Sequence, residues 1–481
     1  MKRLLNLQLA VLAAVLVFAY AVSGLAQDAE PGTLVEQSEA GQVAPPHVPS
    51  TPGTLIIPKS SLPQTAPAGH KAAHTNFQIL VPAGLKPGVS PDVFNGTGYA
   101  YETPASIACH YGLVTTTQSP SCDPNKTTVL PTGGSKTIAI VDAYDDPSAA
   151  GDLAWFSTQF GLTAPGSNFK VVWANTAASS CPVNQGFGVS VDITGNWEFE
   201  EALDIEWTHA MAPSAKIYLV EACSNLDTDL QQAVLIANNL VVCGETELNA
   251  TTGALGKCPT TSTGKGEVTM TWGFEEFDGQ NTSDTCANLD DSCLTAAGVV
   301  YIAAAGDSPG VQWPSTSPNA VSAGGTTLRR NPTTFAFDQE TAWVNTGGGQ
   351  SAIESRQSYQ SSISSIVGTW RGNPDLSLDS DTNTGLWVHD TFPFDGVVTY
   401  DWLIAGGTSA ATVTLAGILN RAGAFAASSS AELTTIYTNK AVTTDFTDIT
   451  VGYCGPYMGF SVKTGWDYCT GVGVVKGYTG K

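Results

Sequence analysis

The sequence predicts an α/β protein with a doubly wound, mostly parallel sheet and flanking helices. Short runs rich in β-branched residues alternate with helical patterns, as expected where helical crossovers join parallel strands. The 481 residues exceed what one hydrophobic core usually supports, so the chain holds either one large domain with insertions or two domains. The alternation continues from about residue 103 to the C-terminus, which favours one long α/β domain.

The elements follow one another in the order that this architecture requires. Apolar, β-branched runs predict strands at 137–141, 170–173, 216–220, 267–272, 299–304 and 320–323. Helical spacing of apolar residues predicts helices at 152–160, 197–211, 226–239, 284–297 and 408–422. Active sites in such sheets gather at the carboxyl ends of the strands, so polar residues there are the first candidates for chemistry.

Charge excludes one class of partner. Lys and Arg number 20 against 43 Asp and Glu, the formal net charge is −23, and no segment carries a basic run that could follow a phosphate backbone. We therefore expect no nucleic-acid partner. Only 13% of residues are charged and 42% are hydrophobic, which indicates a folded chain and not a disordered acidic tail.

The amino end has the features of a secretory signal. Lys2 and Arg3 precede a mostly apolar run at 4–22, and Gly24 and Ala26 are the small residues of a cleavage site. We interpret residues 1–26 as a signal peptide and expect a secreted, periplasmic or extracellular protein, a monomer that has no membrane anchor once the signal is removed.

The next segment differs in composition from the rest of the chain. Residues 27–95 are rich in Pro, Ala, Thr and Ser with little apolar periodicity, and we interpret them as a low-complexity linker or a remnant propiece. Residues 96–481 then form the folded domain.

Ten cysteines, an even number in an exported chain, predict five disulfides between sequence neighbours. The chain has no Cys-x-x-Cys motif, and no cysteine lies beside a pair of histidines, which disfavours a zinc site. The expected pairs are Cys109–Cys122, Cys181–Cys223, Cys243–Cys258, Cys286–Cys293 and Cys454–Cys469.

The expected helix at 197–211 carries paired acids. Its apolar stripe at positions 199, 203, 207 and 210 faces a core, and Glu200 and Asp204 lie four residues apart on one flank. That flank is the border between core and solvent, where one carboxylate can hold and tune the other. Two solvated helix acids are the alternative, because other acids are common on this helix: Glu198, Glu201 and Glu206.

Two more residues stand where chemistry is often found. Ser409 follows Gly406 and Gly407 at the entry to an apolar helical run, so its hydroxyl can act as a nucleophile or as a helix cap. Asp307 follows the strand candidate 299–304; its carboxyl group could donate to an oxyanion while protonated, or could cap a turn.

Together these motifs resemble the sedolisins, the serine-carboxyl peptidases. The resemblance covers roughly residues 100–480, and it is the order and spacing of the strings that make it specific. The matching strings are Thr103–Ile107, Ile138–Pro147, Leu203–Ala215, Ala304–Ser308, Arg371–Asp379, Gly407–Ser409 and Gly465–Gly473.

The resemblance implies a subtilisin-like fold and a secreted serine-type endopeptidase that acts on peptides or proteins in acid. By this resemblance Ser409 is the nucleophile, Glu200 the general base, Asp204 its orienter and Asp307 the oxyanion donor. Since the base must be ionised while the donor stays protonated, reference carboxyl pKa values predict activity at about pH 3 to 5 unless burial raises them.

The carboxyl-terminal stretch also resembles the calcium loop of that family. Asp448 and Asp467 would supply carboxylates and Ile449, Lys463 and Gly465 backbone carbonyls to one structural Ca²⁺, a hard cation that prefers six or more oxygen ligands. The family usually has Gly where Lys463 stands. An ordinary turn held by a disulfide is the alternative.

Three further observations qualify the resemblance. Thr271-Trp272-Gly273 is similar to the family's substrate-lining segment, although Trp272 could equally be a core residue. The family usually has a proline at the position of Val413 and a folded propiece of well over a hundred residues, which the segment before this domain is too short to match.

Two rival functions stay open. A histidine-dependent subtilisin would use Asp142, but no histidine is followed by Gly as that triad requires, and His209 lies inside the helix motif. A non-catalytic secreted binding protein that retains the fold is the second.

Overall fold

The computed structural model describes residues 53–83, 85–86, 90–91, 101–175, 179–181, 189–244, 264–283, 285–394 and 401–481. The predicted signal peptide and Cys258 lie outside these residues, so neither the signal nor the Cys243–Cys258 pairing is described.

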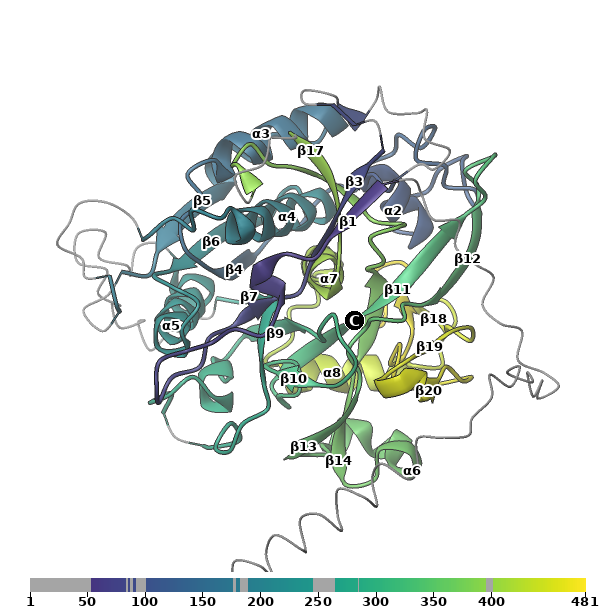
Figure 1. Cartoon of the computed structure of the whole chain (residues 1–481). Helices are drawn as coiled ribbons and strands as arrows, with labels where there is room; N and C mark the ends of the chain where they lie inside the picture. The colour runs from purple at the N-terminus through teal and green to yellow at the C-terminus, as the bar shows by residue number, and fades with distance from the viewer. Residues whose placement is uncertain are drawn as a thin grey trace, which may run out of the picture. The chain divides into compact units, whose positions relative to one another are not determined.

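A ten-stranded sheet forms the centre of the fold (Figure 1). Its strands are parallel except for β12 and β18, which pair antiparallel with β11 and β21. The order is β18 (Phe446–Thr447), β21 (Val474–Val475), β15 (Leu376–Asp379), β11 (Ala320–Arg330), β9 (Val299–Ala304), β7 (Gly266–Met270), β4 (Thr137–Ala143), β6 (Lys216–Ala222) and β5 (Phe169–Trp173), with β12 (Phe337–Ala342) beside β11. The predicted fold class is confirmed.

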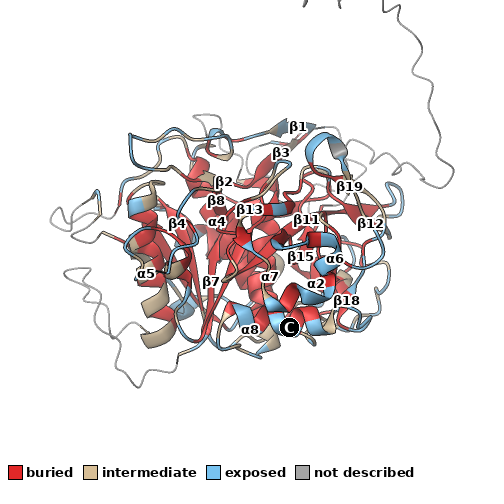
Figure 2. Ribbon diagram, turned by 90° about the horizontal axis from the view of Figure 1, so that it is seen from below, coloured by how far each residue is buried: buried red, intermediate tan, exposed pale blue. Residues whose placement is uncertain are grey.

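Helices cover both faces of this sheet. The side chains of β9 alternate between two apolar clusters: Val300 and Ile302 enter one, Tyr301 and Ala303 the other. The first cluster includes apolar residues of α3 (Ala149–Phe160), α4 (Asn196–Met211), α7 (Thr408–Ala422) and α8 (Ser429–Asn439); the second includes those of α5 (Asp227–Cys243). Figure 2 shows the strands buried between these layers.

Two predicted elements are wrong in detail. The strand expected at 267–272 is interrupted at Thr271, and β8 (Trp272–Glu275) joins a separate sheet with β2 (His74–Thr75) and β10 (Gln312–Trp313). The helix expected at 284–297 is only a 3₁₀ turn, Asp291–Leu294. Side chains there bind nearby backbone instead, since Asp290 accepts from the N–H of Ser292 at 2.8 Å, and short polar residues favour turns in this way.

The segment expected to be a linker contains strands. β1 (Gly53–Ile56) pairs with β3 (Gln78–Pro82), and β3 pairs with β17 (Trp402–Gly406), which pairs with β16 (Leu386–His389). In Figure 1 this purple segment runs beside elements from later parts of the chain. Residues 53–82 are therefore not a linker. The interpretation of this segment as a remnant propiece and the domain boundary at residue 95 stay predictions.

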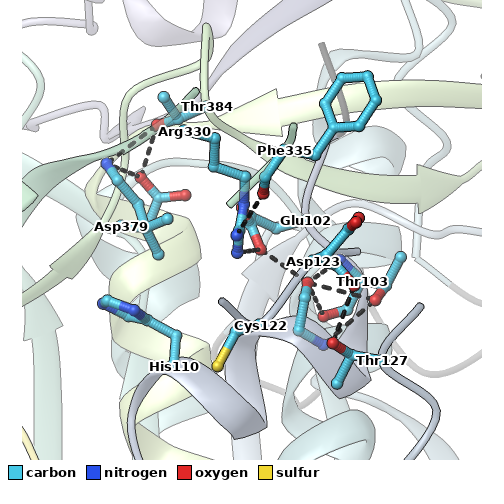
Figure 3. Close-up of polar contacts among 12 residues, drawn as sticks. Glu102, Thr103, His110, Cys122, Asp123, Thr127, Arg330, Phe335, Asp379 and Thr384 are labelled. Atoms are coloured by element: carbon cyan, nitrogen blue, oxygen red, sulfur yellow. Dashed lines mark hydrogen bonds and ion pairs between the residues drawn. The ribbon is translucent and has the colours of Figure 1, made fainter. Parts of the chain in front are cut away.

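Helix α2 (Pro104–His110) is joined to the sheet by a buried polar network (Figure 3). Glu102, just before this helix, accepts from the guanidinium of Arg330 on β11, with 2.8 Å between Nη2 and Oε2. Arg330 also donates to the carbonyl of Phe335, and Asp379 accepts from the hydroxyl of Thr384. Because the Arg330 guanidinium and the Glu102 carboxylate are paired with each other, their charges can be accommodated inside the fold.

Four predicted disulfides are present: Cys109–Cys122, Cys181–Cys223, Cys286–Cys293 and Cys454–Cys469. In the part of the chain that the structure describes, no helix has the length and apolar character needed to span a bilayer.

Candidate active site

Ser409 lies in the first turn of α7, directly after β17. Gly407 precedes the helix with φ of 107°, and a Cβ there would lie 2.2 Å from the carbonyl oxygen of Asn76, so the entry requires glycine. The buried hydroxyl of Ser409 donates a hydrogen bond to Oε1 of Glu200 and lies 3.1 Å from the carbonyl oxygen of Thr271. The structure thus brings together a serine and a carboxylate from segments far apart in sequence.

Glu200 and Asp204 lie on α4, and all sixteen residues of that helix are buried. The expectation that this flank lies at the border between core and solvent was wrong. The helix is enclosed by neighbours on several sides, including α3, α7 and α2, so no face is left for water. The two acids are therefore not solvated helix residues.

A third carboxylate, Asp142 at the end of β4, belongs to the same group. The hydroxyl of Thr271 lies 2.8 Å from Oδ2 of Asp204 and 3.4 Å from Oδ1 of Asp142, and the carboxyls of Asp142 and Asp204 are hydrogen-bonded to each other. A hydrogen bond between two carboxyl groups needs a proton, so at least one of them is neutral. Asp142, the acid that a histidine-dependent subtilisin would use, thus belongs to the same group as Glu200 and Asp204.

The pKa values of these carboxyls are raised. Burial raises the pKa of Glu200 well above its usual range, and the charge of Asp142 raises it further, while hydrogen bonds from Ser409 and Thr271 oppose the shift. Burial likewise raises the pKa of Asp204 and of Asp142. Since all three compete for charge in one buried space, they share protons in acid.

Asp307 lies just beyond the carboxyl end of β9 and faces the start of α7. Its Oδ1 accepts from the N–H of Thr408 at 2.7 Å and from the hydroxyl of Thr408 at 2.9 Å, while its Oδ2 is buried without a hydrogen-bond partner. Burial raises the pKa of Asp307 to about 7, so the carboxyl is protonated in acid. With Oδ1 already accepting, a proton on Oδ2 is available for donation.

Residues of the amino-terminal segment complete the site. The carbonyl oxygen of Asn76 accepts from the N–H of Ser409 at 3.0 Å, and its side-chain amide donates to the carbonyl oxygen of Thr271 at 2.6 Å. Sequence reasoning missed Asn76, because a polar residue in a Pro- and Ala-rich stretch carries no signal of its own. Thr271 could have been found, since it lies in the Thr-Trp-Gly string.

A cavity of about 580 Å³ opens beside the segment that carries Asp307. Its lining includes His74 of the amino-terminal segment, Glu275 at the end of β8, Phe277 just after it, and the two neighbours of Asp307, Gly306 and Ser308. An extended peptide next to Asp307 could place a side chain in it.

The contacts of Trp272 and His209 indicate structural roles for both residues. The Trp272 indole is fully buried, donates to the carbonyl of Val141 at 2.7 Å and packs against Trp313, so it is a core residue. His209 is hydrogen-bonded through Nε2 to the carbonyl oxygen of Thr163 at 2.8 Å, away from Ser409's partners.

Two of the residues expected to hold calcium, Asp448 and Asp467, are hydrogen-bonded to the loop 463–465, which contains two more, Lys463 and Gly465. Oδ2 of Asp448 accepts from the N–H of Gly465 at 2.8 Å, and Oδ2 of Asp467 accepts from the N–H of Lys463 at 3.0 Å. Burial raises the pKa of Asp467 to about 6. Both carboxylates thus accept from N–H groups of the same loop, and carboxylate oxygens are among the ligands that a hard cation prefers.

Comparisons with known proteins find relatives in sequence and in fold. The chain is 31% identical over 183 residues to sedolisin from Pseudomonas sp. (strain 101), covering 35% of this chain and 29% of that protein. It is 29% identical over 370 residues to kumamolisin from Bacillus sp. (strain MN-32), covering 71% of this chain and 58% of that protein. The chain is therefore similar in sequence to members of the sedolisin family.

The solved structure of Pseudomonas sedolisin, a serine-carboxyl proteinase, matches with a TM-score of 0.57 and 22% sequence identity, covering 78% of this chain and 95% of that chain. This likeness shows the fold. The chain spans less than two thirds of the length of the curated sedolisins that it matches. No protein-family model matches it.

Proposed function

We propose that this protein hydrolyses peptide bonds of peptides or proteins in acid, with Ser409 as nucleophile and Glu200 as general base. The observation that carries the proposal is the buried hydrogen bond from the Ser409 hydroxyl to Glu200. A carboxylate that accepts from a serine hydroxyl can remove its proton as the hydroxyl attacks a carbonyl carbon. Glu200 then returns the proton to the leaving amine.

Asp204 and Asp142 act through Glu200. A proton shared between Asp142 and Asp204 leaves one negative charge fewer facing Glu200, and hydrogen bonds from the Ser409 and Thr271 hydroxyls oppose the burial that raises the pKa of Glu200. In this role Asp204 positions the base and never touches the substrate. Negative charge on all three acids together would be costly in so buried a space.

Asp307 supplies one donor of the oxyanion hole, and the backbone N–H of Ser409 supplies the other. A neutral carboxyl group donates to the oxygen of the tetrahedral intermediate, whereas a carboxylate repels it. Because burial raises the pKa of Asp307 to about 7, the upper limit of activity lies nearer to pH 7 than the reference pKa values indicate. Activity falls as pH rises towards that value.

One Ca²⁺ at Asp448 and Asp467 is part of the proposal, with backbone oxygens of Ile449, Lys463 and Gly465 as further ligands. The ion would neutralise the two carboxylates and fix the loop 463–465, which lies inside the segment closed by the Cys454–Cys469 disulfide. Support comes from the two acids that meet at one loop.

Export is proposed on two observations. The sequence begins with a signal-like stretch, the described part of the chain contains four disulfides, and disulfides persist in oxidising compartments outside the cytosol. We further propose that the mature protein acts as a monomer.

The test is digestion of a denatured protein at a series of acid pH values. The parent should release peptides, and Ser409→Ala should release none, whereas Ser430→Ala, at an exposed serine of α8, should match the parent. Glu200→Gln removes the base and should lower the rate by several orders of magnitude at every pH. Parental rates in Ser409→Ala or Glu200→Gln would refute the mechanism, and an inactive parent would favour a non-catalytic binding protein.

A further inference from the structure

The cavity beside the segment that carries Asp307 is lined by charges of both signs. Glu275 and Glu276 contribute carboxyl groups, and the amino-terminal segment contributes three basic residues: His70, Lys71 and His74. The basic residues belong to the stretch that leads into β2, whereas the acids lie at the end of β8 and directly after it. At this cavity the domain therefore presents acidic groups to a basic segment.

The ammonium group of Lys71 is held between a carboxylate and an aromatic ring. Its Nζ lies 3.4 Å from Oδ2 of Asp227 and 3.9 Å from the centre of the Phe277 ring. The face of an aromatic ring attracts a cation, and the nearby carboxylate adds a Coulomb attraction. Asp227 and Phe277 thus form a binding site for a side-chain cation, occupied here by Lys71.

Both groups are held in place by contacts other than Lys71. Asp227 is the first residue of α5, its Oδ1 accepts from the N–H of Thr228 at 3.0 Å, and its side chain is only 13% exposed. Phe277 is half-buried and packs against the apolar cluster that includes residues of α5. Because solvent and salt screen a partly buried pair less than an exposed one, the attraction for a cation is retained here.

The segment that carries Lys71 binds its neighbours through backbone hydrogen bonds. The carbonyl oxygen of Lys71 accepts from the N–H of Asp227 at 2.9 Å, and Ala73 exchanges two hydrogen bonds of 2.8 Å with Asn225. The segment then pairs antiparallel with β8 as β2. Since these bonds use no side chain of the segment, another extended peptide bound along β8 in place of β2 can make them as well.

The same segment relates Lys71 to the proposed chemistry. The backbone N–H of Ser409, a proposed oxyanion donor, holds the carbonyl oxygen of Asn76 at 3.0 Å. Lys71 precedes Asn76 by five residues. A substrate whose scissile carbonyl takes the position of the Asn76 carbonyl therefore places the residue five positions earlier at the position of Lys71.

A second acid favours positive charge nearer to Ser409. Glu275 is exposed at the end of β8, and its charge acts on His74 of the segment. Burial lowers the pKa of His74, whereas a hydrogen bond with the carbonyl oxygen of Thr75 and the charge of Glu275 oppose this shift. Positive charge is thus favoured at more than one position before the scissile bond, and the direct contacts lie at the position of Lys71.

We propose that Asp227 and Phe277 select peptide substrates that carry Lys or Arg five residues before the residue whose carbonyl carbon is attacked. The inference rests on the proposed peptidase function and names the substrate class of the same site. The two residues lie away from the reacting atoms, so they act by binding, and the energy of a remote contact raises kcat/KM. Lys and Arg both fit, since each presents a cation to a carboxylate and to the face of an aromatic ring.

A purely structural role is the alternative for both residues. A negative charge at the first position of a helix stabilises that helix, so Asp227 would serve α5 even without a substrate. Asp227→Asn keeps a side-chain oxygen for the N–H of Thr228 and removes the charge. Phe277→Leu keeps an apolar side chain against its cluster and removes the aromatic face. A structural role predicts that either change affects all substrates equally.

The experiment compares two internally quenched peptides that differ only by Lys or Gln five residues before one scissile bond. That bond is chosen from a digest of a denatured protein by the parent, and mass spectrometry of the products establishes that both peptides are cut there. The parent should cleave the Lys peptide with a kcat/KM about tenfold higher, because an ion pair and a cation–π contact each contribute severalfold. Raising the salt concentration should narrow this ratio.

The variants locate the preference. Asp227→Asn and Phe277→Leu should each reduce the ratio to about threefold or less, without lowering kcat/KM for the Gln peptide. The double variant should cleave the two peptides equally. Asp338→Asn, the same chemical change at an exposed acid of β12, should keep the parental ratio.

Each outcome decides the matter. A parent that cuts both peptides with equal kcat/KM overturns this inference and leaves the peptidase proposal standing. A Lys preference that persists in Asp227→Asn and in Phe277→Leu overturns the assignment to these residues. Equal losses for both peptides in these variants would show a structural role and overturn the inference as well. A parent that cuts neither the peptides nor a denatured protein overturns both proposals.

Discussion

Glu267 offers a quantitative test of how buried acids set the stability of this fold. It lies on β7 with 2% of its surface exposed and accepts from the side-chain amide of Asn420 on α7 at 2.8 Å. Burial raises the pKa of Glu267 from 4.5 to about 8, against the lowering effect of the Asn420 hydrogen bond. The group is therefore neutral in the folded chain at pH 7 and ionised in the unfolded chain.

The sign follows from proton binding. Between pH 4.5 and about 8 the folded state holds one more proton at Glu267 than the unfolded state, so the free energy of unfolding falls as pH rises. Each pH unit in this window costs about 1.4 kcal/mol, and from pH 4.5 to 7 the loss is about 3 kcal/mol. Glu267→Gln keeps an acceptor for Asn420 and does not ionise, so it should raise stability by about 3 kcal/mol at pH 7 and leave it nearly unchanged at pH 4.

Urea unfolding at pH 4, 5, 6 and 7 measures this difference. The comparison is best made in a Ser409→Ala background, which prevents self-digestion, with Glu275→Gln as control because that residue is exposed. Between pH 5 and 7, the slopes of unfolding free energy against pH for Glu267→Gln and its parent should differ by the equivalent of about one bound proton. The slopes for Glu275→Gln and its parent should be equal. Parallel curves for Glu267→Gln and its parent would show that the carboxyl ionises freely inside the fold.

Three further predictions concern other groups. Asp307→Asn should retain some peptidase activity and lose less of it between pH 5 and 7 than the parent, because an amide donates at every pH; matching pH profiles would contradict the oxyanion role, and Asp278→Asn is the exposed control. A calcium chelator should lower the melting temperature of Ser409→Ala, by an amount equivalent to about 3 kcal/mol if Ca²⁺ had been present at a hundred times its Kd, and Asp467→Asn should remove this response; an unchanged melting temperature would exclude the ion. Arg371→Met leaves the buried carboxylate of Asp375, 2.6 Å from Nη2 of Arg371, without its cation and should cost about 3 to 5 kcal/mol in urea unfolding. An effect below about 1 kcal/mol would show that the neighbouring donors suffice.

The sequence pattern predicted the elements whose bounds depend on residues that are neighbours in the sequence. The helix at 408–422 was predicted with the bounds that the structure has, because an apolar run follows two glycines. The β9 strand at 299–304 was predicted equally well from its continuous apolar sequence. Ser409 and Asp307 follow from these elements, since each lies at the end of one.

Partners that are distant in sequence set the rest. β3 is a five-residue strand that pairs with β1 on one side and with β17 on the other, and nothing within a Pro-rich stretch indicates the distant partner β17. The interruption at Thr271 has the same origin, because its carbonyl serves Ser409 and Asn76 and cannot continue the strand ladder. The burial of Glu200 could not be read from a helical wheel either, since it depends on which elements pack around α4.

Helix α4 connects the acidity of the chain to its chemistry. Besides Glu200 and Asp204, it buries three acids whose pKa values burial also raises: Glu198, Glu201 and Glu206. In neutral solution these groups would have to ionise inside the protein or remain protonated at a cost to stability, whereas in acid they are neutral polar residues. The proposed reaction has the same requirement, because a neutral Asp307 is needed to bind the oxyanion. Rising pH therefore weakens the fold and the proposed catalysis through the same event, the loss of protons from buried carboxyls, and stability and activity should decline over overlapping ranges of pH.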